Sequence, residues 1–162
     1  MRRILIAAAI ALSACGGGHK QEAAADASAP PLLIDGRGTI MPLEKAVTHI
    51  AFRPYVPAQA IAFAVLPPLG DLDINDHRGL GVEYQAGRNA MLLSEWPKQG
   101  YTIQFGRSGI LRECQAEHYS TTAVAWTTPG NLLLTLQPDG PVDGAEVNRE
   151  AQRLIRAGAC PR

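Results

Sequence analysis

The chain has 162 residues, of which 46% are hydrophobic and 19% are charged, with 15 basic and 15 acidic side chains. This length and apolar fraction suit a single globular domain with a core of its own. The even charge balance, without any run of Lys or Arg, argues against nucleic acid as a partner.

The first residues have the pattern of a bacterial secretory leader. Two arginines precede an apolar stretch over residues 4–12, which is far shorter than the ~20 residues of a membrane-spanning helix. The sequence LSAC that follows (Leu12–Cys15) resembles the lipobox of bacterial lipoproteins. The resemblance implies that residues 1–14 are removed and that diacylglycerol is attached to Cys15. An ordinary signal peptide with a chance cysteine is the alternative.

A lipid on Cys15 would anchor the protein to a membrane, because each buried acyl CH₂ contributes about 0.8 kcal/mol. Gly16 stands where an Asp would imply retention in an inner membrane. In a Gram-negative source, the lipoprotein rule therefore implies the outer membrane, with the domain facing the periplasm. Residues 15–38 begin with the cysteine and three glycines and are rich in alanine and polar residues. This composition predicts a flexible tether in the cell envelope, outside the cytoplasm.

A single folded domain is expected over residues 39–162, beginning with a short helix. Pro42 suits the first turn of a helix. Apolar residues then recur at spacings of three and four, at Leu43, Ala46, Val47 and Ile50. We expect this helix to end before the Arg53-Pro54 pair.

A series of strands is predicted between the first helix and the last. Apolar or alternating segments occur at residues 61–66, 80–85, 88–96, 101–105, 113–119, 122–126 and 131–137. Gly and Pro residues at 85–87 and 128–131 predict two of the turns between them.

The C-terminal segment predicts the longest helix. Asp143 can cap it, and Glu146 stands where it could complete a capping box. Gly158 is placed to end the helix in a left-handed conformation. The apolar face would consist of Val147, Ala151, Leu154 and Ile155. Together these elements predict an α+β fold, in which an antiparallel sheet carries a short N-terminal helix and a C-terminal helix on one face.

The chain has three cysteines, and the lipobox accounts for one of them. Export would place Cys114 and Cys160 in an oxidising compartment, where a pair in a small domain usually forms a disulfide. Such a bond would join the end of the C-terminal helix to the sheet. A redox-active dithiol is the alternative, although the sequence has no C-x-x-C motif.

Three segments also carry a family resemblance. These are FRPYVPAQA (residues 52–60), LGVEYQAGRNAMLLSEWP (80–97) and AVAWTTPGNLLLTLQPDGPVDGAEVNREAQRLI (123–155). In this order they resemble a domain family of unknown function found at the extracytoplasmic end of bacterial anti-sigma factors and in sporulation-type lipoproteins. The resemblance implies a short helix, two hairpins and a final helix. It implies no catalytic residue, and the 67–79 insert and the two domain cysteines depart from it.

Residues 70–79 contain the one candidate metal site. Asp71, Asp73 and Asn75 have the alternate spacing of the first ligands of a calcium loop. Asp76 replaces the expected glycine, and Val82 replaces the expected bidentate glutamate. A solvated loop in which Asp and Asn favour turns is therefore the preferred interpretation, and we expect neither a metal nor a cofactor.

No catalytic signature is present in the sequence. The four histidines lack the spacing of a zinc site, and the chain has no G-x-S-x-G motif, phosphate loop or dinucleotide fingerprint. His118 could pair with Ser120 or Glu113, but no nucleophile motif supports such a pair. Trp96 and Trp126 could line a groove, although aromatic residues on sheet faces more often belong to the core. We therefore expect a protein that is not an enzyme.

Three functional hypotheses follow. The first is a membrane-anchored envelope lipoprotein with a non-catalytic domain that interacts with another envelope protein or senses the state of the envelope. The second is a module that binds apolar ligands or handles lipids. The third is a secreted hydrolase, which would require His118 or His77 to meet a nucleophile in a cleft. We prefer the first hypothesis.

Overall fold

The computed structural model describes residues 34, 36–68, 77–98 and 111–161. Residues 31–162 form one compact unit of the chain. The leader and the strand expected at 101–105 lie outside the described residues.

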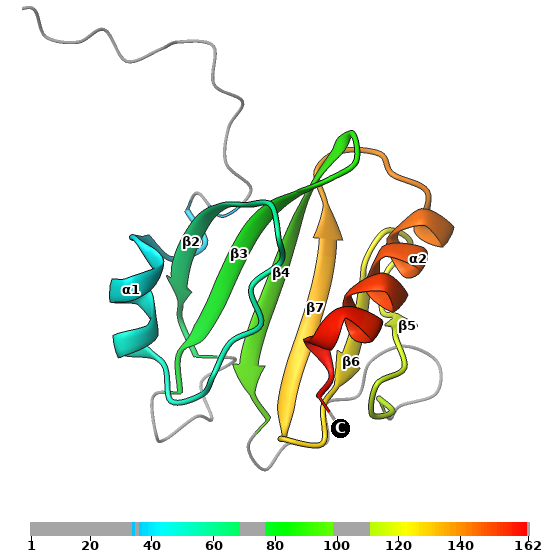
Figure 1. Cartoon of the computed structure of the whole chain (residues 1–162). Coiled ribbons are helices and arrows are strands. Elements are labelled where there is room, and N and C mark those ends of the chain that lie inside the picture. Colours follow the sequence, from blue (N-terminus) through cyan, green and yellow to red (C-terminus); the bar gives the residue numbers. More distant parts are fainter. Residues whose placement is uncertain (1–33, 35, 69–76, 99–110, 162) are drawn as a thin grey trace, which may run out of the picture. The chain divides into compact units, whose positions relative to one another are not determined.

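Seven strands among the described residues form one sheet in the order β1-β2-β3-β4-β7-β6-β5 (Figure 1). Every neighbouring pair of strands is antiparallel. The strands are β1 (Thr39–Ile40), β2 (Ala60–Leu66), β3 (Gly79–Ala86), β4 (Asn89–Pro97), β5 (Glu117–His118), β6 (Val124–Thr127) and β7 (Leu132–Pro138). The first four strands follow chain order and the last three follow it in reverse, which puts β5 at the edge. Strand β7 therefore occupies the middle of the sheet together with β3 and β4.

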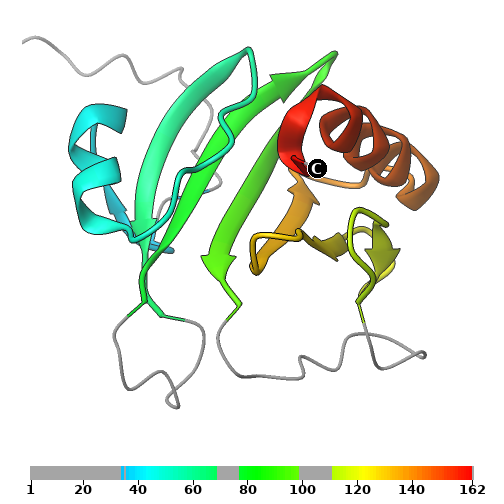
Figure 2. The same ribbon diagram turned by 60° about the horizontal axis from the view of Figure 1, so that its bottom comes forward.

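Both helices cover the same face of the sheet (Figures 1 and 2). The helix α1 (Leu43–Ala46) packs against β2 and continues into a 3₁₀ turn at Val47–His49. The helix α2 (Gly144–Leu154) packs against β5, β6 and β7 and continues into a π turn at Ile155–Ala159. The α+β class and the placement of the helices on one face are as the sequence predicts.

The first helix is shorter than the apolar spacing suggests. Ala46 is fully buried, as expected, but Val47 is 38% exposed and begins the 3₁₀ turn. Because a 3₁₀ turn has three residues per turn, side chains four positions apart no longer share one face there. The expected apolar stripe is therefore interrupted after Ala46, although Ile50 still packs against the core.

The residues of two turns determine where the β3–β4 and β6–β7 hairpins reverse direction. Ala86 pairs with Asn89, which leaves a two-residue turn that begins at Gly87 with φ of +62°. Glycine adopts this conformation without a side-chain penalty. The turn thus starts later than the expected 85–87, because β3 extends through Ala86. The expected turn at 128–131 is present, and the N–H of Asn131 donates to the carbonyl of Thr128 at 3.0 Å.

The start of α2 follows only part of the predicted capping pattern. The carboxylate of Asp143 accepts a hydrogen bond from the N–H of Ala145 at 3.1 Å, which confirms it as the N-cap. Glu146 does not complete a capping box. Its carboxylate instead accepts from the side-chain amide of Asn89 at 3.0 Å, so it ties the helix to the β3–β4 hairpin.

The main core lies between the sheet and its helices. One in-register row crosses five strands on this face and consists of Phe63, Val82, Leu93, Leu136 and Val124. The helix α2 adds three fully buried side chains, Val147, Ala151 and Leu154. Full burial of a Val or Leu side chain contributes roughly 1.5–3 kcal/mol relative to exposure, so this layer accounts for much of the stability.

A second, smaller core covers part of the opposite face. Ile34 is fully buried there and packs with Ala64, Leu66 and Leu92. The packing of the domain thus includes a residue upstream of Thr39, inside the stretch expected to act as a tether. Trp96 also lies on this face, where its indole N–H donates to the carbonyl of Pro67 at 3.1 Å.

Candidate functional site

One carboxyl group lies inside the apolar rows of the helix-covered face. Glu95 of β4 is in register with Leu80 of β3 and Leu134 of β7, and the row continues to Val65 and Trp126. The side chain of Glu95 is only 1% exposed. Glutamate is almost never buried to this extent unless it is paired, so Glu95 identifies the candidate site.

A segment that we call the strap (residues 53–57) covers Glu95. It belongs to the connection between α1 and β2, which crosses the helix-covered face between the two helices (Figures 1 and 2). Pro54 and Pro57 restrict the backbone on either side of Tyr55. The N–H of Tyr55 donates to both carboxyl oxygens of Glu95, at 3.1 and 3.2 Å. The sequence therefore provides the main-chain donor that the buried carboxyl requires.

The protonation of Glu95 differs from that of a surface carboxyl. Burial raises the pKa of Glu95 to about 8, and the hydrogen bond from Tyr55 offsets only part of this rise. Near neutral pH the group is therefore mostly uncharged. A protonated carboxyl can donate an O–H as well as accept hydrogen bonds, so the site can offer a donor to a ligand.

A cavity of about 380 Å³ includes Glu95 in its lining. This volume lies at the lower end of the range of roughly 300–1,000 Å³ found for small-molecule pockets. The other lining residues come from the strap, the β6–β7 hairpin and the C-terminal turn, and they are Arg53, Pro54, Tyr55, Val56, Thr128, Leu132, Ala157, Gly158, Ala159 and Pro161. Most of these side chains are apolar, and Arg53 is the one cation among them.

The C-terminal turn forms one wall of this cavity. Gly158 adopts φ of +115°, as expected for the residue that ends the helix, and the chain then reaches Cys160. A side chain at position 158 would begin 3.7 Å from the ring of Tyr55, which shows how closely the turn approaches the strap. Cys160 is bonded to Cys114, and their Cα atoms are 5.6 Å apart. The disulfide thus fixes the wall to the loop that precedes β5.

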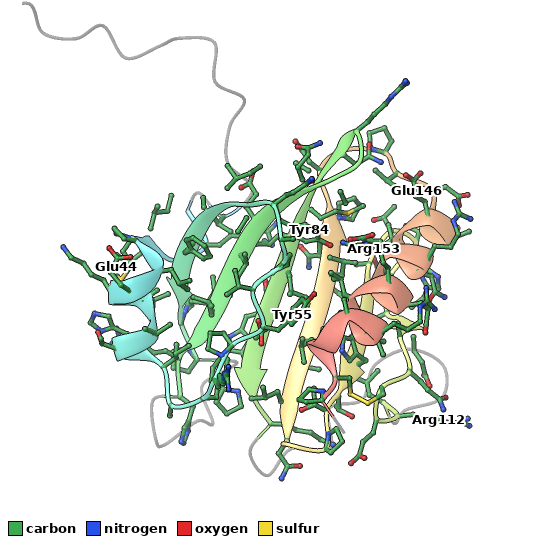
Figure 3. The ribbon with its side chains drawn as sticks, in the orientation of Figure 1. Glu44, Tyr55, Tyr84, Arg112, Glu146 and Arg153 are labelled. Carbon is green, nitrogen blue, oxygen red and sulfur yellow. A yellow bond between two sulfur atoms is a disulfide. The ribbon has the colours of Figure 1, made fainter. Side chains whose placement is uncertain are left out.

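A polar cluster lies beside the cavity, between α2 and the sheet. The hydroxyl of Tyr84 donates to Glu150 at 2.9 Å, and Arg153 binds the same carboxylate at 2.6 and 2.7 Å. Burial acts to raise the pKa of Glu150, but the hydrogen bonds from Arg153 and Tyr84 outweigh it, and the pKa is lowered. Burial also raises the pKa values of Tyr55 and Tyr84, so both phenols are protonated near neutral pH. Figure 3 shows these tyrosines and Arg153 in the same region of the helix-covered face.

The structure describes some of the residues proposed from the sequence and not others. Cys114 and Cys160 form the expected disulfide. Cys15, the proposed lipid attachment site, lies outside the described residues, and so do the possible calcium ligands Asp71, Asp73 and Asn75. Within the described part of the chain, no group of three or more His, Cys, Asp or Glu side chains is placed to hold a metal ion.

The structure does not join His118 to the partners considered for it. His118 lies in β5, against the start of α2, where Gly144 leaves room for its ring. Ser120 accepts a hydrogen bond from the N–H of Thr122. No hydrogen bond within residues 111–161 connects His118 with Ser120 or with Glu113.

Sequence reasoning missed Glu95, although a signal for it exists. Along the strand predicted at 88–96, Met91 and Leu93 alternate toward one face, and the next position on that face is Glu95. A carboxylate at a position where the alternation requires an apolar residue is unusual. The covering strap and the C-terminal wall come from distant parts of the chain and carry no comparable signal.

Comparison with family models, with curated proteins and with solved structures finds no match for this chain. The resemblance to the domain family of anti-sigma factors and sporulation-type lipoproteins therefore stays a prediction. Among the described residues, no helix has the length and apolar character needed to cross a membrane.

Proposed function

We propose that this chain is a lipid-anchored protein of the cell envelope whose domain is a non-catalytic sensing module. The cavity at Glu95 is the observation that carries the proposal, with its buried carboxyl, largely apolar walls and one cation, Arg53. Such a combination of apolar surface with a few convergent polar groups and a perturbed pKa is typical of binding sites. In this proposal the cavity is where the domain detects its ligand.

The use of cysteine supports placement in the envelope. Two of the three cysteines are bonded to each other within the domain, and the third is the one in the lipobox. Disulfides persist in oxidising compartments and are rare in the cytosol. Bonding of the pair is thus consistent with export, and it leaves Cys15 as the attachment point.

The lipid anchor is tested by metabolic labelling with radioactive palmitate. We expect the wild-type protein to incorporate label and the Cys15→Ser variant to incorporate none, because the serine cannot form the thioether. A variant that carries both Cys114→Ala and Cys160→Ala is the matched control, and it should incorporate label like the wild type. An unlabelled wild-type protein that retains its leader would contradict the anchor.

The non-catalytic part of the proposal has a separate test. Purified protein should release no product from panels of ester, amide, glycoside and phosphoester substrates. Turnover that is abolished by a substitution of His118 would favour the hydrolase alternative over a sensing module.

A further inference from the structure

The cavity is lined by a buried carboxyl that can donate a hydrogen bond to a ligand when it is protonated. In the protonated state, the carboxyl of Glu95 has an O–H, and its oxygens already accept from the N–H of Tyr55. Among the described residues, the hydrogen bonds of the Glu95 carboxyl are the two that it accepts from Tyr55. Because buried donors almost always have partners, an acceptor on a ligand would complete this site.

The charges around Glu95 favour an anionic acceptor. The strap contributes Arg53, which lines the same cavity, and Tyr55. The in-register neighbours on β3 and β7 are leucines, and the C-terminal turn contributes non-titratable residues at 157–159. From α2, Glu150 and Arg153 act on the phenol of Tyr55, and they are already paired with each other. Arg53 is therefore the cation in the cavity lining that could balance a bound anion.

We propose that the cavity binds a small aliphatic carboxylate, whose headgroup accepts the Glu95 O–H and pairs with Arg53 while its alkyl chain lies on the apolar wall formed by Val56, Leu132 and Ala159. This inference rests on the proposed function and names the ligand class that the domain senses. A carboxylate suits both polar groups at once, since it accepts hydrogen bonds from neutral and cationic donors alike. An ammonium ligand would lie beside Arg53 and would require Glu95 to lose its proton.

The binding should depend on pH through Glu95. The competent state is the one in which Glu95 is protonated, so the apparent affinity scales with the protonated fraction. Burial raises the pKa of Glu95 to about 8. Affinity for the carboxylate should therefore be constant in mild acid and fall by about tenfold for each pH unit above that value.

Calorimetric titration with sodium octanoate tests this inference. The protein would be the chain from residue 15 onward with Cys15→Ser, which retains the whole domain and removes acyl chains that would compete with the probe. We expect saturable binding near pH 6 and binding weaker by about tenfold or more near pH 9.5. Octylamine should bind more weakly than octanoate near pH 6.

Two substitutions separate the roles of the polar groups. Arg53→Gln should weaken octanoate binding by about tenfold, which is typical for loss of a charge-assisted hydrogen bond. Arg88→Gln is the matched control, because Arg88 is exposed in the β3–β4 turn and lies outside the cavity lining, and it should bind like the parent protein. Glu95→Gln retains an N–H donor and cannot titrate, so it should bind octanoate equally at both pH values.

Three results would overturn the inference: no saturable binding of octanoate near pH 6, equal affinity of the parent protein at both pH values, or tighter binding of octylamine than of octanoate. Circular dichroism of each variant confirms that the domain is folded. Palmitate labelling reports independently on the anchor. A protein that incorporates palmitate but does not bind octanoate would refute the ligand class alone. A protein that binds octanoate but incorporates no palmitate would refute the anchor alone.

Discussion

Burial of Glu95 lowers the stability of the domain relative to an apolar residue at the same position. An apolar residue at this position would continue the row from Leu80 to Leu134 without any desolvation cost. The folded protein reduces the cost of burying Glu95 by keeping it protonated and by providing the N–H of Tyr55. Packing alone does not explain a carboxyl in the lining of this cavity, and the proposed binding site gives it a role.

Substitution Glu95→Gln should change how stability depends on pH. The pKa of Glu95 is raised from its ordinary value of 4.5 to about 8 in the folded state, so folding favours the protonated form. Its favourable contribution is complete below about pH 4.5 and is lost as the pH rises through 8, at up to about 1.4 kcal/mol per pH unit. The glutamine keeps the acceptor for Tyr55 and cannot ionise. The variant should therefore exceed the wild type in free energy of unfolding by about 3–5 kcal/mol near pH 9.

Urea unfolding at several pH values measures this difference. Glu146→Gln is the matched control, because Glu146 is exposed and its bond to Asn89 can be kept by the amide oxygen. Its stability should run parallel to that of the wild type across the pH range. Equal stabilities of wild type and Glu95→Gln near pH 9 would show that the buried carboxyl does not resist ionisation.

Among the elements, the C-terminal turn and the strap form the site by meeting over the sheet. Neither segment belongs to a strand. The prolines at 54 and 57 restrict the backbone of the strap, and the disulfide at Cys160 holds the turn. The two segments approach each other at Tyr55 and Gly158. The shape of the cavity should therefore change if the prolines or the disulfide are removed.

Removal of the disulfide by Cys114→Ala with Cys160→Ala tests this element. The bond closes a loop with a sequence separation of 46, and loss of such a crosslink lowers the free energy of unfolding by about 4 kcal/mol in the chain-entropy model. Chemical denaturation should show the decrease, and Cys15→Ser should leave the unfolding midpoint unchanged. An unchanged midpoint in the double variant would mean that the bond does not constrain the unfolded chain.

The elements of this fold were predictable where their pattern was local. Apolar or alternating segments identified β3, β4 and β7, and Asp143 and Gly158 marked the two ends of the C-terminal helix. One prediction failed where a tertiary contact competes with a local one, and another failed where the helix changes its period. Glu146 bonds to Asn89 across the domain instead of capping its own helix, and α1 tightens into a 3₁₀ turn after Ala46.

At the scale of the whole molecule, the site could not be predicted from the sequence. Its lining comes from residues 53–56, Glu95, Thr128, Leu132 and the last turn, which the order of the sheet and the disulfide bring together. Sequence patterns report the period of single elements and not the distances between them. The class of the fold and the disulfide were accessible from the sequence, whereas the cavity was not.

Two proposals about the whole molecule can fail separately. The first is that a lipid on Cys15 holds the chain at a membrane, and the second is that the cavity at Glu95 binds a small carboxylate. In the proposed arrangement, the tether keeps the domain in the envelope, where the concentration of a small carboxylate and the pH can both change. Protonation of Glu95 would then make the response greater in mild acid than in base.

The most direct test of this account is a titration of the Glu95 carboxyl carbon by ¹³C NMR, with the signal assigned through its absence in Glu95→Gln. We expect a midpoint near the value of about 8 that burial imposes on this group. A midpoint close to 4.5, the ordinary value for glutamate, would show that Glu95 is ionised at neutral pH and would contradict the proposed site.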